Sequence, residues 1–220
     1  MRIVVISDLH SNFDGHVLNE IQTAVIGFEA ADQAGLDEKL IHLDGTPNNA
    51  RFGANAILGI SMAAARAMAN ERGIPLYRYF ADKSEYLIPV PMLNLLNGGK
   101  HADNNVDFQE FMIVPVGAPS FVEALRAAAE TFHALKEALH RKGYATGVGD
   151  EGGFAPQLRA NEEAMELLDF AIVKAGYKVG GDIVINLDPA ASEFFEDGMY
   201  VFSKSDNSKR TPVEMVSLWE

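Results

Sequence analysis

The pattern of apolar and polar residues divides the chain into a helical first part and a mixed second part. In the first part the pattern predicts three helices in succession, over residues 32–43, 54–72 and 76–80. Pairs of glycine and proline, residues that end helices, follow the first two of them. Ahead of these helices, the apolar run Ile3–Ile6 predicts a short buried strand, which leads into a polar turn over residues 7–12.

The second part begins with apolar runs that predict strands. Strands are expected over residues 88–96 and 111–116, with a polar loop over residues 97–105 between them. A third buried strand is expected over residues 182–187, and it ends at Asp188. Charged residues just beyond the carboxyl ends of strands are typical of a barrel of alternating strands and helices.

Two further helices are expected between the second and third strands. The clearer one starts with a capping box formed by Ser120 and Glu123 and ends before Gly143. Its apolar residues recur at spacings of three and four, which gives it one apolar face that we expect to pack on the sheet: Phe121, Leu125, Ala128, Phe132, Leu135 and Leu139. The other helix is expected to be capped by Asn161 and to run to Ala175.

Composition narrows the class of protein. The chain has 220 residues, 48% of them hydrophobic and 22% charged, which is a globular composition with enough length for a sizeable core. The net charge of −13 argues against binding to nucleic acid or to a membrane surface, because both need an excess of lysine and arginine. The chain has no cysteine and no apolar run long enough for a signal peptide or a membrane span, so we expect a cytoplasmic protein.

Residues 148–156 carry the strongest chemical signal. They read VGDEGGFAP, which places the adjacent carboxylates of Asp150 and Glu151 among three glycines. Glycines allow backbone conformations closed to other residues and let a ligand come close, while Pro156 stiffens the exit of the loop. Two acids in such a loop indicate proton transfer or metal binding. The alternative is a solvated turn in which neither acid has a role.

Four candidate residues stand at comparable places in the predicted elements. His101 follows the first strand of the second part, Glu110 precedes the second strand, Glu151 lies in the glycine loop, and Asp188 ends the third strand. Each has a simpler explanation when taken alone: a histidine in a loop is usually on the surface, and Asp188 could cap the chain reversal before Ala190. The combination of the four favours a functional site.

Several long motifs occur in one order along the chain. They are VPMLN at residues 90–94, LNGGKHADNN at 96–105, QEFM at 109–112, VGDEGGFAP at 148–156, LD at 187–188 and SEFF at 192–195. Upstream stand DGTPN at residues 44–48 and GANAILG at 53–59. Together these motifs resemble enolases (phosphopyruvate hydratases) of the bacterial type. The resemblance runs from about residue 17 to the last residue.

The resemblance implies a lyase of glycolysis that interconverts 2-phosphoglycerate and phosphoenolpyruvate with Mg2+ as cofactor. It implies that Glu151 is the acid that assists departure of the hydroxyl, with Glu110 beside it. His101, Gln109 and Glu110 are then substrate-binding residues, and Asp188 is a magnesium ligand. The chemistry is consistent, because hydroxide leaves poorly without a proton donor and a hard cation suits a carbanion delocalised onto a carboxylate.

The resemblance also implies a domain organisation. Residues 1–16 do not match enolase, residues 17–84 correspond to part of its helical amino-terminal domain, and residues 85–220 correspond to the first part of its barrel. The expected fold class is therefore α/β with an incomplete enolase-type β/α barrel, truncated at both ends. Within the last region, residues 203–210 are predicted to be a polar linker and residues 211–219 a helix.

The first sixteen residues resemble the opening of a different family, the calcineurin-like metallophosphoesterases. There a strand delivers an aspartate and a histidine, here Asp8 and His10, to a two-metal site. The Asn-His pair that this family carries further along does not occur in the sequence. A metallophosphoesterase is therefore the weakest of the functional alternatives.

The expected truncation limits the catalytic interpretation. In enolases the other magnesium carboxylates, the lysine that removes the proton and the phosphate-binding residues come from the later half of the barrel. The isolated chain is then either an enolase with little or no activity or a non-catalytic enolase-derived fragment that acts as a binding or assembly partner. An incomplete barrel exposes strand edges and apolar helix faces, so we expect a homo-oligomer or association with a complementary enolase chain.

Overall fold

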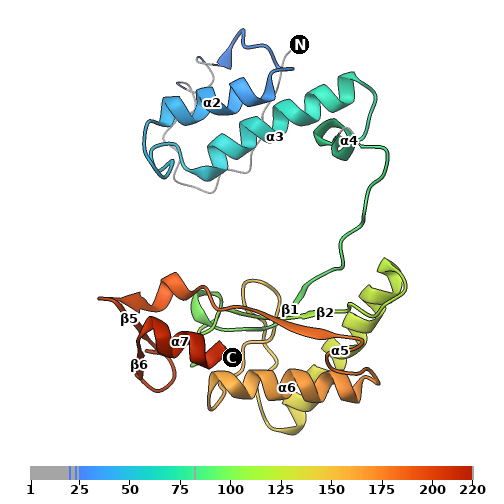
Figure 1. Ribbon diagram of the computed structural model, residues 1–220, viewed down its shortest axis with the longest axis vertical. Helices are drawn as coiled ribbons and strands as arrows, with labels where there is room; N and C mark the ends of the chain where they lie inside the picture. The colour runs from blue at the N-terminus through green and yellow to red at the C-terminus, as the bar shows by residue number, and fades with distance from the viewer. Residues whose placement is uncertain (1–19, 21–22, 24, 82, 220) are drawn as a thin grey trace. The chain divides into compact units, whose positions relative to one another are not determined.

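The chain folds into two compact units, Met1–Tyr86 and Leu87–Glu220. The computed structural model describes residues 20, 23, 25–81 and 83–219 (Figure 1). The predicted strand Ile3–Ile6 and the candidate metal ligands Asp8 and His10 lie outside the described residues. Within the described part of the chain, no helix is both long enough and apolar enough to cross a membrane.

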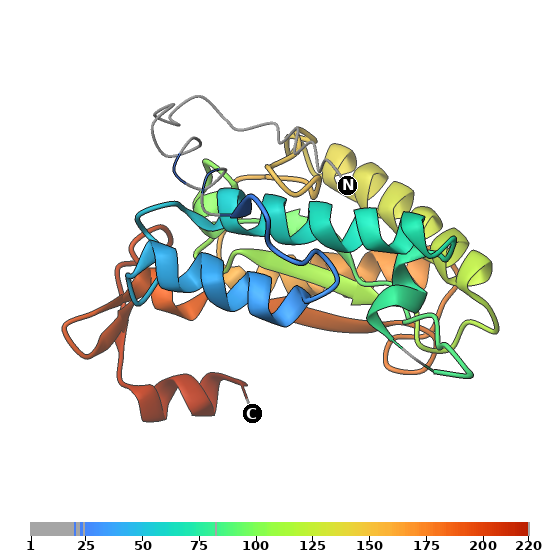
Figure 2. The same cartoon turned by 90° about the horizontal axis from the view of Figure 1, so that it is seen from above.

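The first unit is helical, as the sequence predicts. Its helices are α2 (Gln33–Asp44), α3 (Ala54–Glu71) and α4 (Leu76–Phe80). The side chain of Asp32 caps α2 by accepting a hydrogen bond from the Gly35 amide at 3.0 Å, and Gly45 ends the helix in the left-handed conformation. Figure 2 shows α2 and α3 side by side. Their small core consists of Leu36, Leu40, Phe52, Ala56, Ile57 and Ala64.

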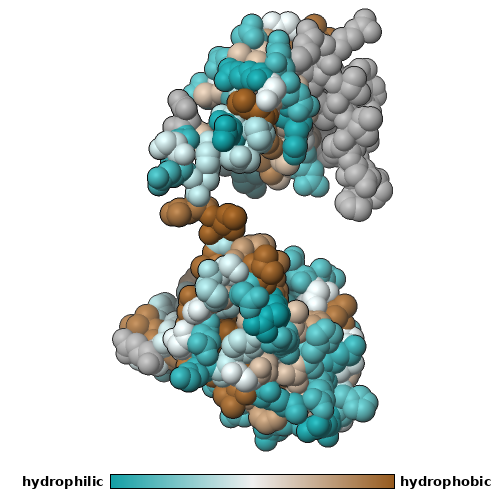
Figure 3. All heavy atoms as spheres, turned by 90° about the vertical axis from the view of Figure 1, so that its right-hand side faces the viewer, coloured by the Kyte–Doolittle hydropathy of each residue, from teal (hydrophilic) through white to brown (hydrophobic). Residues whose placement is uncertain are grey.

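A three-stranded antiparallel sheet is the centre of the second unit. Its strands, in spatial order, are β1 (Leu93–Asn97), β2 (Glu110–Val114) and β3 (Val184–Asp188). The predicted first strand is too long, because the segment before Leu93 is extended but unpaired. Its apolar side chains are exposed, 96% at Leu87 and 75% at Ile88, and Figure 3 shows hydrophobic surface on this extended segment.

A β-bulge in β1 decides which residues share a face of the sheet. Asn94 pairs with Met112 and Asn97 with Glu110, which leaves Leu95 as an extra residue between them. Paired residues of antiparallel strands point to the same face, so Asn94 and Asn97 lie on the face of Glu110 although they are three positions apart. The partner of Glu110 in β3 is Asp188, which extends this polar face.

The other face of the sheet is apolar and is covered by two helices. These are α5 (Phe121–Arg141) and α6 (Asn161–Lys174), and Figure 1 shows both on the same side of the sheet. The core between sheet and helices includes Leu96, Phe111, Ile113, Leu135, Leu139, Leu167, Leu168 and Ile172, all of them buried. Burial of each such side chain contributes roughly 1.5–3 kcal/mol.

The predicted face of α5 packs differently from the expectation. The helix packs mainly against α6, and it reaches the sheet side of the core through Phe132, whose ring stacks on Phe154 with centroids 4.4 Å apart. Phe121 and Leu125, at the start of the predicted face, are about two-fifths exposed at 42% and 41%. The Ser120 side chain does accept a hydrogen bond from the Glu123 amide, as a cap requires.

Two predicted features of the second unit are wrong. Asn161 is not the cap of α6, since Ala160 holds that position, and the Asn161 side chain instead binds the loop before β2. The segment 203–210 is not a plain linker. It belongs to a second antiparallel sheet, β4 (Phe195–Glu196), β5 (Met199–Val201) and β6 (Lys209–Arg210), which is followed by the predicted last helix, α7 (Pro212–Trp219).

Aromatic packing explains why this second sheet forms. Phe202 is 3% exposed and lies edge-on to Phe108, with ring centroids 5.4 Å apart. The rings of Phe194 and Trp219 also pack against Phe108, tilted to its plane, so the apolar residues of a polar-looking tail gather in one cluster. Among the described residues no sheet closes into a barrel, and the fold is an incomplete α/β barrel as expected.

Candidate active site

The strand register brings three polar residues side by side at one end of the sheet. Asn97 is the last residue of β1, Glu110 the first of β2 and Asp188 the last of β3, and Glu110 pairs with both of the others. The chain continues from Asn97 through the short 3-10 helix Gly99–His101. His101 and Asp188 therefore both belong to the end of the sheet at which β2 begins.

His101, Glu110 and Glu151 form the closest group of ionisable side chains at this end. One ligand atom from each residue lies within 4.8 Å of those of the other two. The Nδ1 atom of His101 is 3.5 Å from Oε1 of Glu110, close enough for an ion pair when the imidazole is protonated. The two atoms are not aligned for a hydrogen bond, and the buried Nδ1 has no hydrogen-bond partner.

Glu110 is the member of this group with a shifted pKa. Burial raises the pKa of its carboxyl above the ordinary value, and the negative charges of Asp188 and Glu151 raise it further. The only opposing influence is His101, whose positive charge when protonated lowers the pKa of Glu110. Glu110 thus keeps its proton to a higher pH than a solvated glutamate, which suits a group that handles protons.

The glycine loop is held against the end of β1 by backbone hydrogen bonds. The Asn97 amide donates to the Phe154 carbonyl at 2.9 Å, and the Asp150 amide donates to the carbonyl of His101 at 3.0 Å. Gly152 has a φ of 82°, a left-handed conformation that favours glycine. At Gly153 a Cβ atom would lie 2.1 Å from Oδ1 of Asn97, so only glycine fits there. Gly153 therefore lets the loop pack closely against β1, whereas the sequence suggested that the glycines let a ligand come close.

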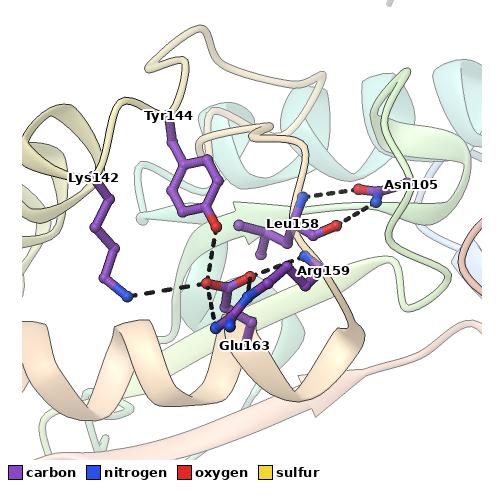
Figure 4. A network of polar contacts seen from close by, with 6 residues as sticks. All are labelled: Asn105, Lys142, Tyr144, Leu158, Arg159 and Glu163. Carbon is purple, nitrogen blue, oxygen red and sulfur yellow. Dashed lines mark hydrogen bonds and ion pairs between the residues drawn. The ribbon is translucent and has the colours of Figure 1, made fainter.

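Asparagine side chains join the His101 loop to the exit of the glycine loop. Asn104 donates from Nδ2 to the carbonyls of Asn97, at 2.9 Å, and Pro156, at 3.1 Å. Asn105 binds the backbone of Leu158 in both directions, accepting from its amide at 2.8 Å and donating to its carbonyl (Figure 4). These amides replace the missing sheet hydrogen bonds between two irregular segments.

A buried carboxylate anchors the same exit from the other side. Glu163, 4% exposed, accepts hydrogen bonds from the Arg159 amide and guanidinium and from the Tyr144 hydroxyl (Figure 4). These donors, with the Arg159 side chain first, lower the pKa of Glu163 to about 2. Glu163 therefore stays ionised and fixes the start of α6.

Comparison with family models identifies the two units. Residues 85–219 match the C-terminal TIM barrel domain of enolase, and residues 12–80 match its N-terminal domain. The longer match alone covers more than half of the chain. The chain belongs to the enolase family. Membership places it among the lyases of the enolase superfamily.

Two other residues expected at an enolase site have different surroundings. Asp188 is exposed and accepts a hydrogen bond from the Ala190 amide at 2.9 Å, so it does cap the chain reversal. One carboxylate oxygen remains for another role, and Asp188 still faces Glu110 across the sheet. Gln109 binds Gly98 through its backbone carbonyl. Within the described part of the chain, its side chain has no hydrogen bond to the ionisable group.

Magnesium, which the enolase family typically binds, fits the oxygen donors at this site. The Asp188 and Glu110 carboxylates are of the type that magnesium prefers, but two of them leave most of an octahedral shell to substrate and water. His101 adds a nitrogen donor to the group of Glu110 and Glu151, and imidazole suits transition metals better than magnesium. Among the described residues of this site, Asp188, with Glu110 beside it, therefore offers the oxygen donors that magnesium would need.

An open hollow of about 540 Å3 lies between β1 and α5 next to the enolase site residues. Glu151 and Gly152 line one end, and apolar side chains such as Leu125 and Phe132 line most of the rest. An apolar lining provides no positive charge for a phosphate. Lys100, in the loop that carries His101, forms an ion pair with Glu193.

Proposed function

We propose that the site of this chain belongs to an enolase that converts 2-phosphoglycerate reversibly to phosphoenolpyruvate. The observation that carries the proposal is the group of His101, Glu110 and Glu151 within 4.8 Å, with burial and like charges raising the pKa of Glu110. Dehydration removes a proton from one carbon and a hydroxide from the next, so the leaving oxygen needs a proton. Glu110, whose raised pKa lets it retain a proton to higher pH, supplies a proton to this group.

In this proposal Glu151 gives its proton to the leaving hydroxyl and Glu110 assists from the adjacent strand. Glu151 is exposed, which leaves its carboxyl accessible to a ligand, whereas Glu110 is partly buried. The negative charge of Glu151 is one of the influences that raise the pKa of Glu110. A ligand oxygen that approaches Glu151 then meets an acid whose proton Glu110 can replace.

The remaining assignments concern binding. We assign His101 and Gln109 to contacts with substrate and Asp188 to magnesium, together with substrate oxygens. Magnesium, when bound, supplies positive charge to the carboxylate of the substrate and stabilises the carbanion that forms next to it. The buried Nδ1 of His101 has no hydrogen-bond partner among the described residues, so its hydrogen-bonding capacity is not used by the fold.

Within the described part of the chain, no lysine that could remove the proton from substrate contacts the group of His101, Glu110 and Glu151. Lys100 pairs with Glu193, and the Nζ atom of Lys204 binds backbone carbonyls. We therefore propose that the chain alone turns over slowly or not at all and that it works as a homo-oligomer or with a complementary enolase chain in the cytoplasm. We also propose that residues 17–84 and 85–220 act as its two enolase domains.

The test measures phosphoenolpyruvate formation by ultraviolet absorbance with 2-phosphoglycerate and magnesium, for the wild-type chain, Glu151→Gln and the exposed control Glu162→Gln. The proposal expects any turnover to require magnesium, to vanish in Glu151→Gln and to persist in Glu162→Gln. If the wild-type chain shows no turnover, magnesium-dependent binding of 2-phosphoglycerate is measured by calorimetry. Neither turnover nor binding would leave a non-catalytic enolase-derived fragment as the better description.

A further inference from the structure

Lys204 reaches from the turn after β5 to the loop that carries His101. Its Nζ atom donates hydrogen bonds to the carbonyl oxygens of Ala102, at 2.7 Å, and of Gly99. These carbonyls stand on either side of His101 in the sequence, so one ammonium group holds the backbone before and after the imidazole. The sequence gives no local signal for this contact, because Lys204 and Ala102 are 102 residues apart.

The turn that carries Lys204 is itself anchored to the same loop. The Lys204 amide donates to Oδ1 of Asp107 at 2.9 Å, and the Ser205 hydroxyl donates to Oδ2. Asp107 is 4% exposed, and Asn161 donates to its Oδ2 at 3.1 Å. The main chain of Lys204 is therefore fixed before its side chain extends, which makes the placement of Nζ specific.

The environment of Lys204 also differs from that of a surface lysine. Burial lowers the pKa of its ammonium, while the nearby Asp103 and Asp107 favour the charged form. A lysine loses side-chain entropy and hydration when it is fixed in this way. Hydrogen bonds from a charged donor to two carbonyls offset that cost. A lysine that only solubilised the tail would gain nothing from this arrangement.

We propose that Lys204 is a positioning residue that sets the orientation of the His101 imidazole through the carbonyls of Gly99 and Ala102. The inference rests on the substrate-binding role proposed for His101. It adds to that role a residue from the segment after β5, outside the strands that form the site. Lys204 acts on the backbone of the loop and does not touch the imidazole itself.

The experiment records the imidazole resonances of the full chain by NMR, with isotope-labelled histidine and no substrate. Lys204→Met removes the ammonium and keeps an unbranched side chain, and Lys209→Met changes an exposed lysine of β6 as a matched control. The resonances of His101 are expected to shift by several line widths in Lys204→Met and to stay unchanged in Lys209→Met. His133 and His140, both on α5, report whether the fold is intact.

A folded Lys204→Met chain with wild-type His101 resonances would overturn the inference, even if its stability fell. Lys204→Arg keeps the charge and the donors in a planar arrangement, so its His101 resonances are expected to lie between those of Lys204→Met and wild type. If Lys204→Met does not fold, Lys204→Arg decides alone: unchanged His101 resonances in it reduce Lys204 to a structural role. Because no step uses substrate, the result is independent of turnover.

Discussion

Glu163 and Glu110 are both withdrawn from solvent in the second unit, with side chains 4% and 20% exposed, yet their surroundings act on them in opposite directions. Glu163 accepts hydrogen bonds from Arg159 and Tyr144, and its pKa falls to about 2. Glu110 lies beside Asp188 and Glu151 with only His101 to oppose them, and its pKa rises. The fold therefore compensates one buried charge fully and leaves the other in a repulsive setting.

The difference indicates what each carboxylate is for. A buried charge with all its partners strengthens the fold only while it stays ionised, so Glu163 belongs to the scaffold. A carboxylate kept near other acids costs stability, and such groups persist where chemistry needs a proton. In this chain, a pKa lowered by hydrogen-bond donors therefore marks the carboxylate of the scaffold, and a pKa raised by burial and neighbouring acids marks the carboxylate of the candidate site.

The largest expected effect comes from removing the compensated charge. Glu163→Gln should lower the free energy of unfolding by about 2–3 kcal/mol at neutral pH, because charged hydrogen bonds to Arg159 and Tyr144 are lost. Since the pKa falls from 4.5 to about 2 on folding, the wild-type contribution is present above pH 4.5 and is lost as the pH falls towards 2. Urea unfolding at several pH values measures both the loss of stability in the variant and the pH dependence of the wild-type contribution.

Glu162→Gln, at the exposed neighbouring position of α6, is the control for that measurement. It should change the free energy of unfolding by no more than about 0.5 kcal/mol. Equal losses in the two variants would contradict the scaffold role of Glu163.

The next effect concerns the connection between scaffold and site. Asn105→Ala should lower the free energy of unfolding by about 1–2 kcal/mol, since the amide and carbonyl of Leu158 both lose their hydrogen-bond partner. Amide hydrogen exchange in residues 148–154 should accelerate more than exchange in α5, because Asn105 holds the exit of the glycine loop. Gln157→Ala, in the same segment but with one weak bond of 3.4 Å, should change neither quantity appreciably.

Relief of the repulsive group should have a smaller effect of opposite sign. Because the pKa of Glu110 is raised on folding, its ionised form destabilises the fold, and this cost appears as the pH rises through the pKa. Glu110→Gln should therefore raise the free energy of unfolding at neutral pH, by on the order of 1 kcal/mol. Calorimetry at pH 7 and at pH 4 compares the ionised and the protonated form of Glu110. The gain in the free energy of unfolding should be smaller at pH 4.

Loss of stability in Glu110→Gln at neutral pH would remove the contrast with Glu163. Glu151→Gln serves as the comparison, since Glu151 is exposed and should affect stability less.

The smallest effect is expected from an exposed network that also joins charged side chains through several hydrogen bonds. Arg126 binds Glu123 and Glu130 on the surface of α5, and its side chain is 54% exposed. Arg126→Gln should cost no more than about 0.5 kcal/mol, and less at high salt, because solvent screens such pairs. Arg159→Gln should cost more, since it leaves the buried Glu163 without its main partner. Equal costs in urea unfolding would show that burial does not set the difference.

The helices were the part of the fold that the sequence predicted well. Asp32, Gly45, Ser120 and Gly143 act on their own helix ends, and α2, α3 and α5 accordingly begin and end within one residue of the prediction. The strands depend on neighbours that are distant in sequence, so the unpaired segment before Leu93 was assigned to β1 in error.

The site shows the same division. Motifs marked His101, Glu110 and Glu151 as candidates, and the structure brings these three together. The clamping role of Asn105 was invisible, because its partner Leu158 lies 53 residues away and neither residue belongs to a regular element. Asn161 was assigned as a cap, since asparagine before a helix usually is one, but the tertiary contact with Asp107 took its side chain.

The extra residue in β1 has a consequence for comparing this chain with its relatives. Leu95 has no partner in β2, and because it is bulged out of the pairing, Asn94 and Asn97 face the same way although they are three positions apart. Deleting Leu95 would leave the two asparagines two positions apart in a regularly paired strand, where they would still share a face. An alignment that runs through residues 94–97 without a gap against a regular strand therefore equates residues of opposite faces on one side of Leu95, whereas a gap opposite Leu95 keeps the faces matched.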